Sequence, residues 1–154
     1  MTNRTVFQFI SEPSDVNYGG NVHGGSVMKW IDQAGYACAS SWASSYCVTV
    51  YVGGIRFYEP IKIGHIVKVE AEVIYTGNTS MHIAINVFSR NIKRKDFDKK
   101  THCIIVFVAV DDEGNSIDVP KFVPETEAQK QLEQYAIKLM ELRKNIEQEM
   151  KPFL

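Results

Sequence analysis

The chain has 154 residues, of which 45% are hydrophobic and 23% are charged, with a formal net charge of −1. This length and composition predict one globular domain with a sizeable core and argue against disorder. A net charge so close to zero also argues against a general nucleic-acid binder, because binding to phosphates needs a basic surface.

The cysteines and the N-terminus indicate the compartment. Cys38, Cys47 and Cys103 are an odd number without a C-x-x-C pair, a pattern that suits a reducing environment. The first residues lack the apolar core of a secretory signal, and no apolar run approaches the ~20 residues of a membrane span. The sequence therefore predicts a cytoplasmic protein that does not cross a membrane.

A short strand and a long helix are expected in the first part of the chain. Residues 6–10 form a candidate strand, which ends before Pro13. Between residues 23 and 43, apolar side chains recur at helical spacing and form one broad face. Small residues such as Gly35 and Ala39 would let another element approach this largely buried helix closely.

Strand-like segments follow the helix. Residues 46–57 are rich in β-branched and aromatic side chains, and the pair Gly53-Gly54 indicates a bulge or a close backbone approach. Residues 67–75 and 81–87 alternate between apolar and polar side chains, which is typical of strands with one solvent-facing side.

The last third of the chain begins with an apolar strand and ends in a helix. Residues 104–110 are apolar throughout, which predicts a strand covered on both faces. After Pro124, apolar residues return at helical spacing among many charged ones, which predicts an amphipathic helix. We therefore expect an α+β fold with an antiparallel sheet against a central helix, in which residues 1–123 form the domain and residues 124–154 its helical extension.

The run from Asn17 to Asp32 is the most informative about function. A polar, glycine-rich loop opens directly into the long helix, whose start has unpaired N–H groups and the positive end of the helix dipole. Backbone N–H groups near Gly24 and Gly25 could therefore hold an oxyanion. Asp32, about two and a half turns further on, is a candidate base or nucleophile.

Each of these residues also has a simpler structural interpretation. Asp32 lies at the border between the apolar and polar faces of the helix, so spacing alone does not separate a catalytic carboxylate from a solvated one. Asn17 and Asn21 lie among glycines, where asparagine is common for turn geometry, although a side-chain amide can also orient water or polarise a carbonyl. A lone histidine at a helix start, such as His23, is typical of a cap.

Two further segments could meet an anionic ligand. Residues 77–80 lie between two strands, and their simplest interpretation is a hairpin turn. A basic cluster begins at Arg90 and is interrupted by two aspartates. No H-E-x-x-H or cysteine–histidine spacing indicates a metal site, and no G-x-S-x-G elbow indicates a serine hydrolase.

Several short motifs together resemble the hotdog-fold acyl-CoA thioesterases, specifically the cytosolic acyl-CoA hydrolase group. The combined pattern is specific and covers most of the chain from about Ser11 to Pro120, in the right order. The matching residues are Pro13, Asp15 and Asn17; Gly20 to Gly25; Asp32, Ala34 and Gly35; Phe57, Pro60 and Gly64; and Tyr75 to Met81.

The resemblance implies a fold, an assembly and a site. The fold is a hotdog, a long central helix wrapped by an antiparallel sheet, and the chains pair into homodimers that often form a homohexamer, a trimer of dimers. In such a site Asp32 serves as base or nucleophile and Asn17 assists from the facing subunit, while the N–H groups of Gly24 and Gly25 bind the thioester oxygen. The CoA moiety lies against the turn formed by Gly77, Asn78, Thr79 and Ser80. The basic Arg90 is a further candidate contact for CoA.

Thioester chemistry agrees with this function. A thiol has a pKa near ~8.5 and can leave as a thiolate without a strong general acid, so one carboxylate and an oxyanion site suffice. An amide hydrolase would need a second acid or a triad. We therefore predict an acyl-CoA thioesterase of fatty acid metabolism that releases a free fatty acid and CoA, with no cofactor beyond the CoA of its substrate.

Other functions stay open at this point. A hotdog dehydratase would pair a histidine, here His23, with a carboxylate, and a non-catalytic acyl-CoA sensor would keep binding without turnover. Relatives commonly carry an acidic or polar residue where this chain has Gly53-Gly54, so any role of that side chain in the acyl site does not carry over. The acyl chain length, nucleotide regulation and the choice between base and nucleophile for Asp32 are not revealed.

Overall fold

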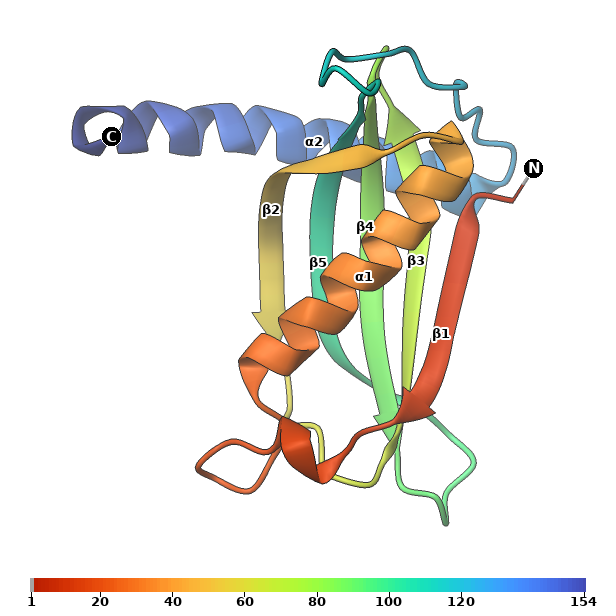
Figure 1. Ribbon diagram of the computed structural model, residues 1–154, viewed down its shortest axis with the longest axis vertical. Coiled ribbons are helices and arrows are strands. Elements are labelled where there is room, and N and C mark those ends of the chain that lie inside the picture. The colour runs from red at the N-terminus through yellow and green to blue at the C-terminus, as the bar shows by residue number, and fades with distance from the viewer. Residues whose placement is uncertain (1) are drawn as a thin grey trace.

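The computed structural model describes residues 2–154, and a single antiparallel sheet organises it. The five strands are β1 (Arg4–Ile10), β2 (Cys47–Phe57), β3 (Ile66–Thr76), β4 (Ser80–Arg90) and β5 (Asp98–Ala109), in the order β1-β3-β4-β5-β2. Helix α1 (Gly24–Ala43) crosses one face of the sheet diagonally, and helix α2 (Glu127–Met150) crosses the other face and runs on past β2 (Figure 1). Short 3-10 turns lie at Pro13–Asp15 and Lys151–Phe153. This is the α+β hotdog arrangement expected from the sequence.

Helix α1 forms the core together with the sheet face that it covers. It begins after His23 and ends where Ser44 adopts a left-handed conformation with φ of 51°. At Gly35, a Cβ atom would lie 2.9 Å from Cδ1 of Ile85 and 3.0 Å from Cε2 of Phe107. The prediction that small residues let another element approach this helix is confirmed, because only a residue without a side chain leaves this space to the sheet.

The sequence predicted a bulge or close backbone approach at Gly53-Gly54 and a strand covered on both faces at residues 104–110, and the structure confirms a bulge and a central strand. In β2 the pairing with β5 shifts between Gly53 and Arg56, and Gly54 has φ of 63°, so the glycine pair forms a bulge. Strand β5 lies between β4 and β2, and its residues 103–107 are buried. Strands β1 and β2 are the two edges of the sheet.

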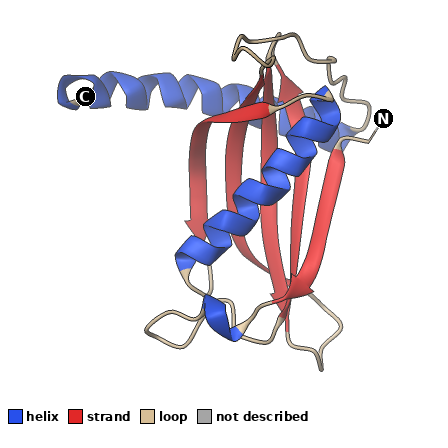
Figure 2. Ribbon diagram, in the orientation of Figure 1, coloured by secondary structure: helices blue, strands red, loops and turns tan. Residues whose placement is uncertain are grey.

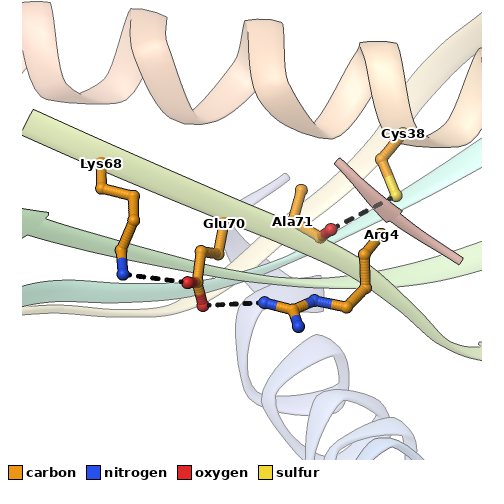
Figure 3. Close-up of polar contacts among 5 residues, drawn as sticks. All are labelled: Arg4, Cys38, Lys68, Glu70 and Ala71. Carbon is orange, nitrogen blue, oxygen red and sulfur yellow. Dashed lines mark hydrogen bonds and ion pairs between the residues drawn. The ribbon is translucent and has the colours of Figure 1, made fainter. Parts of the chain in front are cut away.

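Charged side chains lie on the face of β3 opposite α1. Glu70 pairs with Arg4 and with Lys68, each at 3.2 Å, on the side away from α1 (Figure 3). From the other side, Cys38 of α1 donates a long hydrogen bond of 3.7 Å to the carbonyl oxygen of Ala71. The predicted alternation of β3 is thus confirmed, with apolar residues under α1 and charged ones on the other face.

Helix α2 covers part of this outer face with the apolar side predicted from the sequence. Thr126 begins it with a capping box, in which its side chain accepts from the N–H of Gln129. Hydrogen bonds of 2.8 Å join Tyr135 to His102 and His102 to Asn86, which fixes the helix to β5 and β4. Within residues 2–154 no helix combines the length and apolarity that crossing a membrane requires.

The buried histidine His82 of β4 should make the free energy of unfolding depend on pH. It is 4% exposed, and burial together with the nearby charge of Arg143 lowers its pKa from 6.5 to about 4. Between these values the unfolded chain binds more protons than the folded one, so the folded state loses up to roughly 3 kcal/mol as pH falls from about 6.5 to 4. Thermal denaturation at pH 7 to 4 should show this loss in the wild type and a smaller loss in His82→Gln. Identical pH dependence in both proteins would contradict the prediction.

Candidate functional site

Asn17 lies in a loop that its own side chain closes. Its Oδ1 accepts hydrogen bonds from the N–H groups of Gly19 at 2.9 Å and Asn21 at 3.0 Å, and its N–H donates to the carbonyl of Asn21 at 2.7 Å. The turn interpretation of this asparagine is therefore confirmed. The side-chain NH₂ of Asn17 makes no hydrogen bond within residues 2–154, which leaves it able to donate to a ligand.

The start of α1 offers one of the two predicted backbone donors. His23 is the N-cap, and its Nδ1 accepts the N–H of Gly25 at 2.8 Å. The histidine is thus a cap, as its position suggested, and it occupies the donor predicted at Gly25. The N–H of Gly24 has no partner among the described residues and points out of the helix start. Of the two predicted backbone donors, the N–H of Gly24 is the one left unpaired within residues 2–154.

A cavity brings the asparagine loop and the helix start together. It has a volume of about 310 Å³ and lies between the loop before α1 and the loop after β2, which meet at one end of the sheet (Figure 2). Its lining combines the two predicted donors with apolar residues of α1 and of the end of β2. These residues include Asn17, Gly24, Val27, Phe57, Pro60 and Ile61.

Asp32 lies outside this cavity. It is eight residues beyond Gly24, which corresponds to about 12 Å along the helix. Its Oδ1 accepts a hydrogen bond of 3.3 Å from Oγ1 of Thr49 on β2. Both residues are exposed in the single chain. Asp32 and Asn17 are not brought together within one chain.

Thr49 is the residue of this site that sequence reasoning missed. It lies in the run Cys47–Val52, and its β-branched side chain was used only to predict a strand there. A usable signal was present, because strand alternation puts Thr49 on the same face as Cys47, which is buried under α1. A hydroxyl on that face of the strand lies within reach of the polar border of the helix.

The two predicted CoA-binding segments lie at opposite ends of β4. Residues 77–80 form the expected hairpin turn, in which the N–H of Gly77 donates to the carbonyl of Ser80 at 3.0 Å. Arg90 lies at the far end of the same strand, roughly 33 Å away. There it lines a second cavity of about 330 Å³ that shares Glu59 and Pro60 with the Asn17 cavity. The hairpin instead lies near Thr49, because Thr49 pairs with Phe107, and Phe107 pairs with Met81.

The sequence and the fold both match known proteins. The thioesterase superfamily model matches residues 19–95. A Buchnera aphidicola relative named uncharacterized acyl-CoA thioester hydrolase is 35% identical over 112 residues, which cover 71% of this chain and 83% of that protein. A hexameric acyl-CoA thioesterase in its apo form has a TM-score of 0.90 and 31% identity, over 94% of this chain and 92% of that one. An acyl-CoA hydrolase from Staphylococcus aureus, solved with butyryl-CoA and CoA, has a TM-score of 0.90 and 28% identity, over 99% and 93% of the two chains.

The Staphylococcus aureus hydrolase has also been solved with an asparagine, an aspartate or a threonine replaced by alanine. In that protein the asparagine precedes the aspartate by 15 positions, and the threonine follows the aspartate by 17. Asn17, Asp32 and Thr49 have the same residue types at the same spacing. The superfamily match, the identity to the Buchnera relative and the superposition of almost the whole fold agree: this chain belongs to the thioesterase superfamily.

Proposed function

We propose that this protein is an acyl-CoA thioester hydrolase, which releases a free fatty acid and CoA from acyl-CoA. The observation that carries the proposal is the set Asn17, Asp32 and Thr49, which matches in type and spacing the residues changed in the Staphylococcus aureus acyl-CoA hydrolase. The proposed reaction needs no metal and no separate cofactor, because the thiolate is a good leaving group and CoA is part of both substrate and product.

Asp32 supplies the carboxylate in this proposal. It activates a water molecule or attacks the thioester carbonyl directly. The hydrogen bond of 3.3 Å from Thr49 engages one carboxylate oxygen and restrains its orientation, which leaves the other oxygen for the water or the substrate. Thr49 is thereby a positioning residue for Asp32.

The free donors at the other end of α1 meet the substrate oxygen. The unpaired N–H of Gly24 lies at the positive end of the helix dipole, where it can stabilise the charge that develops on the thioester oxygen. The NH₂ group of Asn17 lines the same cavity and can donate beside it. Because these donors lie about 12 Å along the helix from Asp32, a complete site requires two chains.

The exposed edge of the sheet supports such a pairing. Strand β2 is long, and Val50 and Val52 on it are 53% and 40% exposed, which makes it a template for another strand. Antiparallel pairing of two β2 strands about their midpoint would bring Thr49 toward the end of the partner's β2, beside the partner's cavity. We infer a homodimer with sites formed by both chains.

Further apolar surface supports assembly beyond the dimer. The opposite edge strand β1 exposes Val6 and Ile10. Helix α2 runs on past β2 (Figure 1), and its last turns and the residues after it expose an apolar stripe. Since a structural neighbour at a TM-score of 0.90 is a hexamer, we propose a homohexamer, a trimer of dimers. The residues of the stripe are Leu142, Ile146, Met150, Phe153 and Leu154.

The basic cavity beside the Asn17 cavity suits the phosphates of CoA. It contains Arg90, Lys62 and Lys100, and Glu59 pairs with Lys100 at 2.7 Å. We propose that Arg90 meets CoA here and that residues 77–80 contact it from the other subunit, since one chain holds the two segments at opposite ends of β4. We also propose a cytoplasmic location, which the three free and buried cysteines support.

An assay of thiol release with short, medium and long acyl-CoA esters tests the function. We expect release of CoA thiol together with an equal amount of fatty acid whose double bonds are unchanged, which separates hydrolysis from a dehydratase reaction. Tight binding of acyl-CoA without thiol release at any chain length would contradict hydrolysis and favour a sensor. The absence of both binding and release would favour a structural domain.

A further inference from the structure

A separate cavity lies on the outer face of the sheet, under α2. It has a volume of about 160 Å³ and is bounded by α2 and by strands β2, β4 and β5. None of the residues proposed for hydrolysis lines it. Its walls are mostly apolar, and two nitrogen-bearing side chains, His82 and Arg143, are set among Ile104, Val106, Ala136 and Leu139.

His82 is buried at this cavity without a polar partner. It is 4% exposed and lines the cavity, and no hydrogen bond to its ring is seen within residues 2–154. The edge-to-face contact with Tyr75, with ring centres 5.1 Å apart, holds the ring by packing alone. Because burial lowers its pKa to about 4, the ring is neutral at pH 7 and offers one N–H donor.

Arg143 brings a positive charge, and its Nε lacks a hydrogen-bond acceptor among the described residues. Its guanidinium lies over the ring of Tyr51, with Cζ 4.7 Å from the ring centre, and its buried Nε has no hydrogen-bond partner. The carboxylate beside it, Glu147, is 65% exposed and 3.8 Å from Nε, which is too long for a hydrogen bond.

Strand β2 supplies no side-chain carboxylate or amide to Arg143 at this cavity. The β2 residues that line the cavity are Tyr51, Gly53 and Gly54, and no carboxylate or amide is among them. The Tyr51 ring occupies the space that a side chain at Gly53 would need, since a Cβ there would lie 2.5 Å from a ring carbon. The buried Nε of the partly exposed Arg143 and the buried ring of His82 lack hydrogen-bond acceptors within the described part of the chain, which indicates that a group carrying acceptors belongs between them.

We propose that this cavity binds a short aliphatic carboxylate, with its oxygens toward Arg143 and His82 and its alkyl chain against Ile104, Val106 and Leu139. A carboxylate supplies hydrogen-bond acceptors to both side chains and a negative charge inside the cavity, and the apolar walls favour a hydrocarbon tail over a bare inorganic anion. The volume corresponds to about five water molecules, which is the size of a chain such as butyrate. This site does not depend on the proposed hydrolysis, although hydrolysis of short acyl-CoA would release such an acid.

Equilibrium dialysis of the intact assembly against labelled butyrate tests the proposal. We expect saturable binding of one butyrate per chain, retained in Asp32→Ala and weakened at least tenfold in Arg143→Met, which keeps the apolar length of the side chain and removes the charge. Lys144→Met is the matched control, because it removes the neighbouring exposed charge of the same helix and should leave binding unchanged. His82→Phe fills the cavity and should also abolish binding.

A neutral ligand and a long-chain ligand test whether the cavity selects for charge and for size. Butyramide should bind at least tenfold more weakly than butyrate, and a twelve-carbon fatty acid should not compete, because it exceeds the cavity. Unchanged butyrate affinity in Arg143→Met, with its assembly and thermal stability intact, would overturn the proposal. So would loss of binding in Asp32→Ala alone, which would place the butyrate in the hydrolytic site, or the absence of saturable binding up to about 10 mM.

Discussion

Replacing Asp32 by alanine should lower kcat for acyl-CoA hydrolysis by about 10²–10⁴-fold, the range that a positioned general base or nucleophile contributes. Because the carboxylate is exposed in the single chain and its one polar contact is with Thr49, its removal should leave the fold intact. Steady-state kinetics with a thiol-release assay measure the effect, and thermal denaturation checks the fold. Gln33→Ala, the neighbouring exposed residue of the same helix, is the matched control and should keep wild-type kcat.

Thr49→Val should produce a smaller loss in the same assay. The substitution keeps the β-branched shape and removes only the hydroxyl that donates to Asp32, and one hydrogen bond to a charged group corresponds to roughly 10–100-fold in rate. Turnover in Asp32→Ala equal to that of the wild type would refute the role of the carboxylate. A loss in Thr49→Val as large as that in Asp32→Ala would instead make the hydroxyl a reacting group.

Mixing two inactive variants should restore activity. If each site takes Asp32 from one chain and Asn17 from its partner, Asp32→Ala and Asn17→Ala chains co-assembled at random in equal amounts should recover about a quarter of the wild-type sites. The recovery follows because some mixed pairs place the intact Asp32 of one chain beside the intact Asn17 of the other. The distance of about 12 Å along α1 between the two halves of the site is the structural basis for this expectation.

The control for this experiment is each variant assembled with itself. Neither should recover activity, because every site then lacks the same group. Thiol release by the mixed assembly is compared with that of wild-type protein at equal chain concentration. If the mixed assembly is no more active than the separate variants, then each chain completes its own site and the shared-site proposal is wrong.

Much of the fold could be predicted from local patterns. Apolar spacing predicted α1 and α2, because each helix buries one continuous face against the sheet. Gly53-Gly54 predicted a bulge, since a positive φ at Gly54 is a property of the residue itself. The turn at Asn17 and the cap at His23 were equally local, because both satisfy backbone N–H groups within two to four residues.

The candidate site was less accessible to sequence reasoning. Asn17, Gly24 and Asp32 were identified by motif, but the N–H of Gly25 is occupied by the ring of His23, which no spacing rule revealed. Thr49 was missed because its contact joins a strand to Asp32, a helix residue 17 positions earlier in the chain. Such contacts depend on how the sheet curls around α1, and the hydrophobic pattern does not record that geometry.

By itself, the sequence determined the elements, their order, the buried face of each and the residue types of the site, because hydrophobic periodicity and turn chemistry act over a few residues. The tertiary structure alone decided which of those residues meet. It separates Asn17 from Asp32 along α1, joins Asp32 to Thr49, and places His82 beside Arg143 under α2, where the Nε of Arg143 has no hydrogen-bond acceptor within residues 2–154. The physical reason is that these pairings arise from packing between elements far apart in the chain, where position is set by the whole core and not by neighbouring residues.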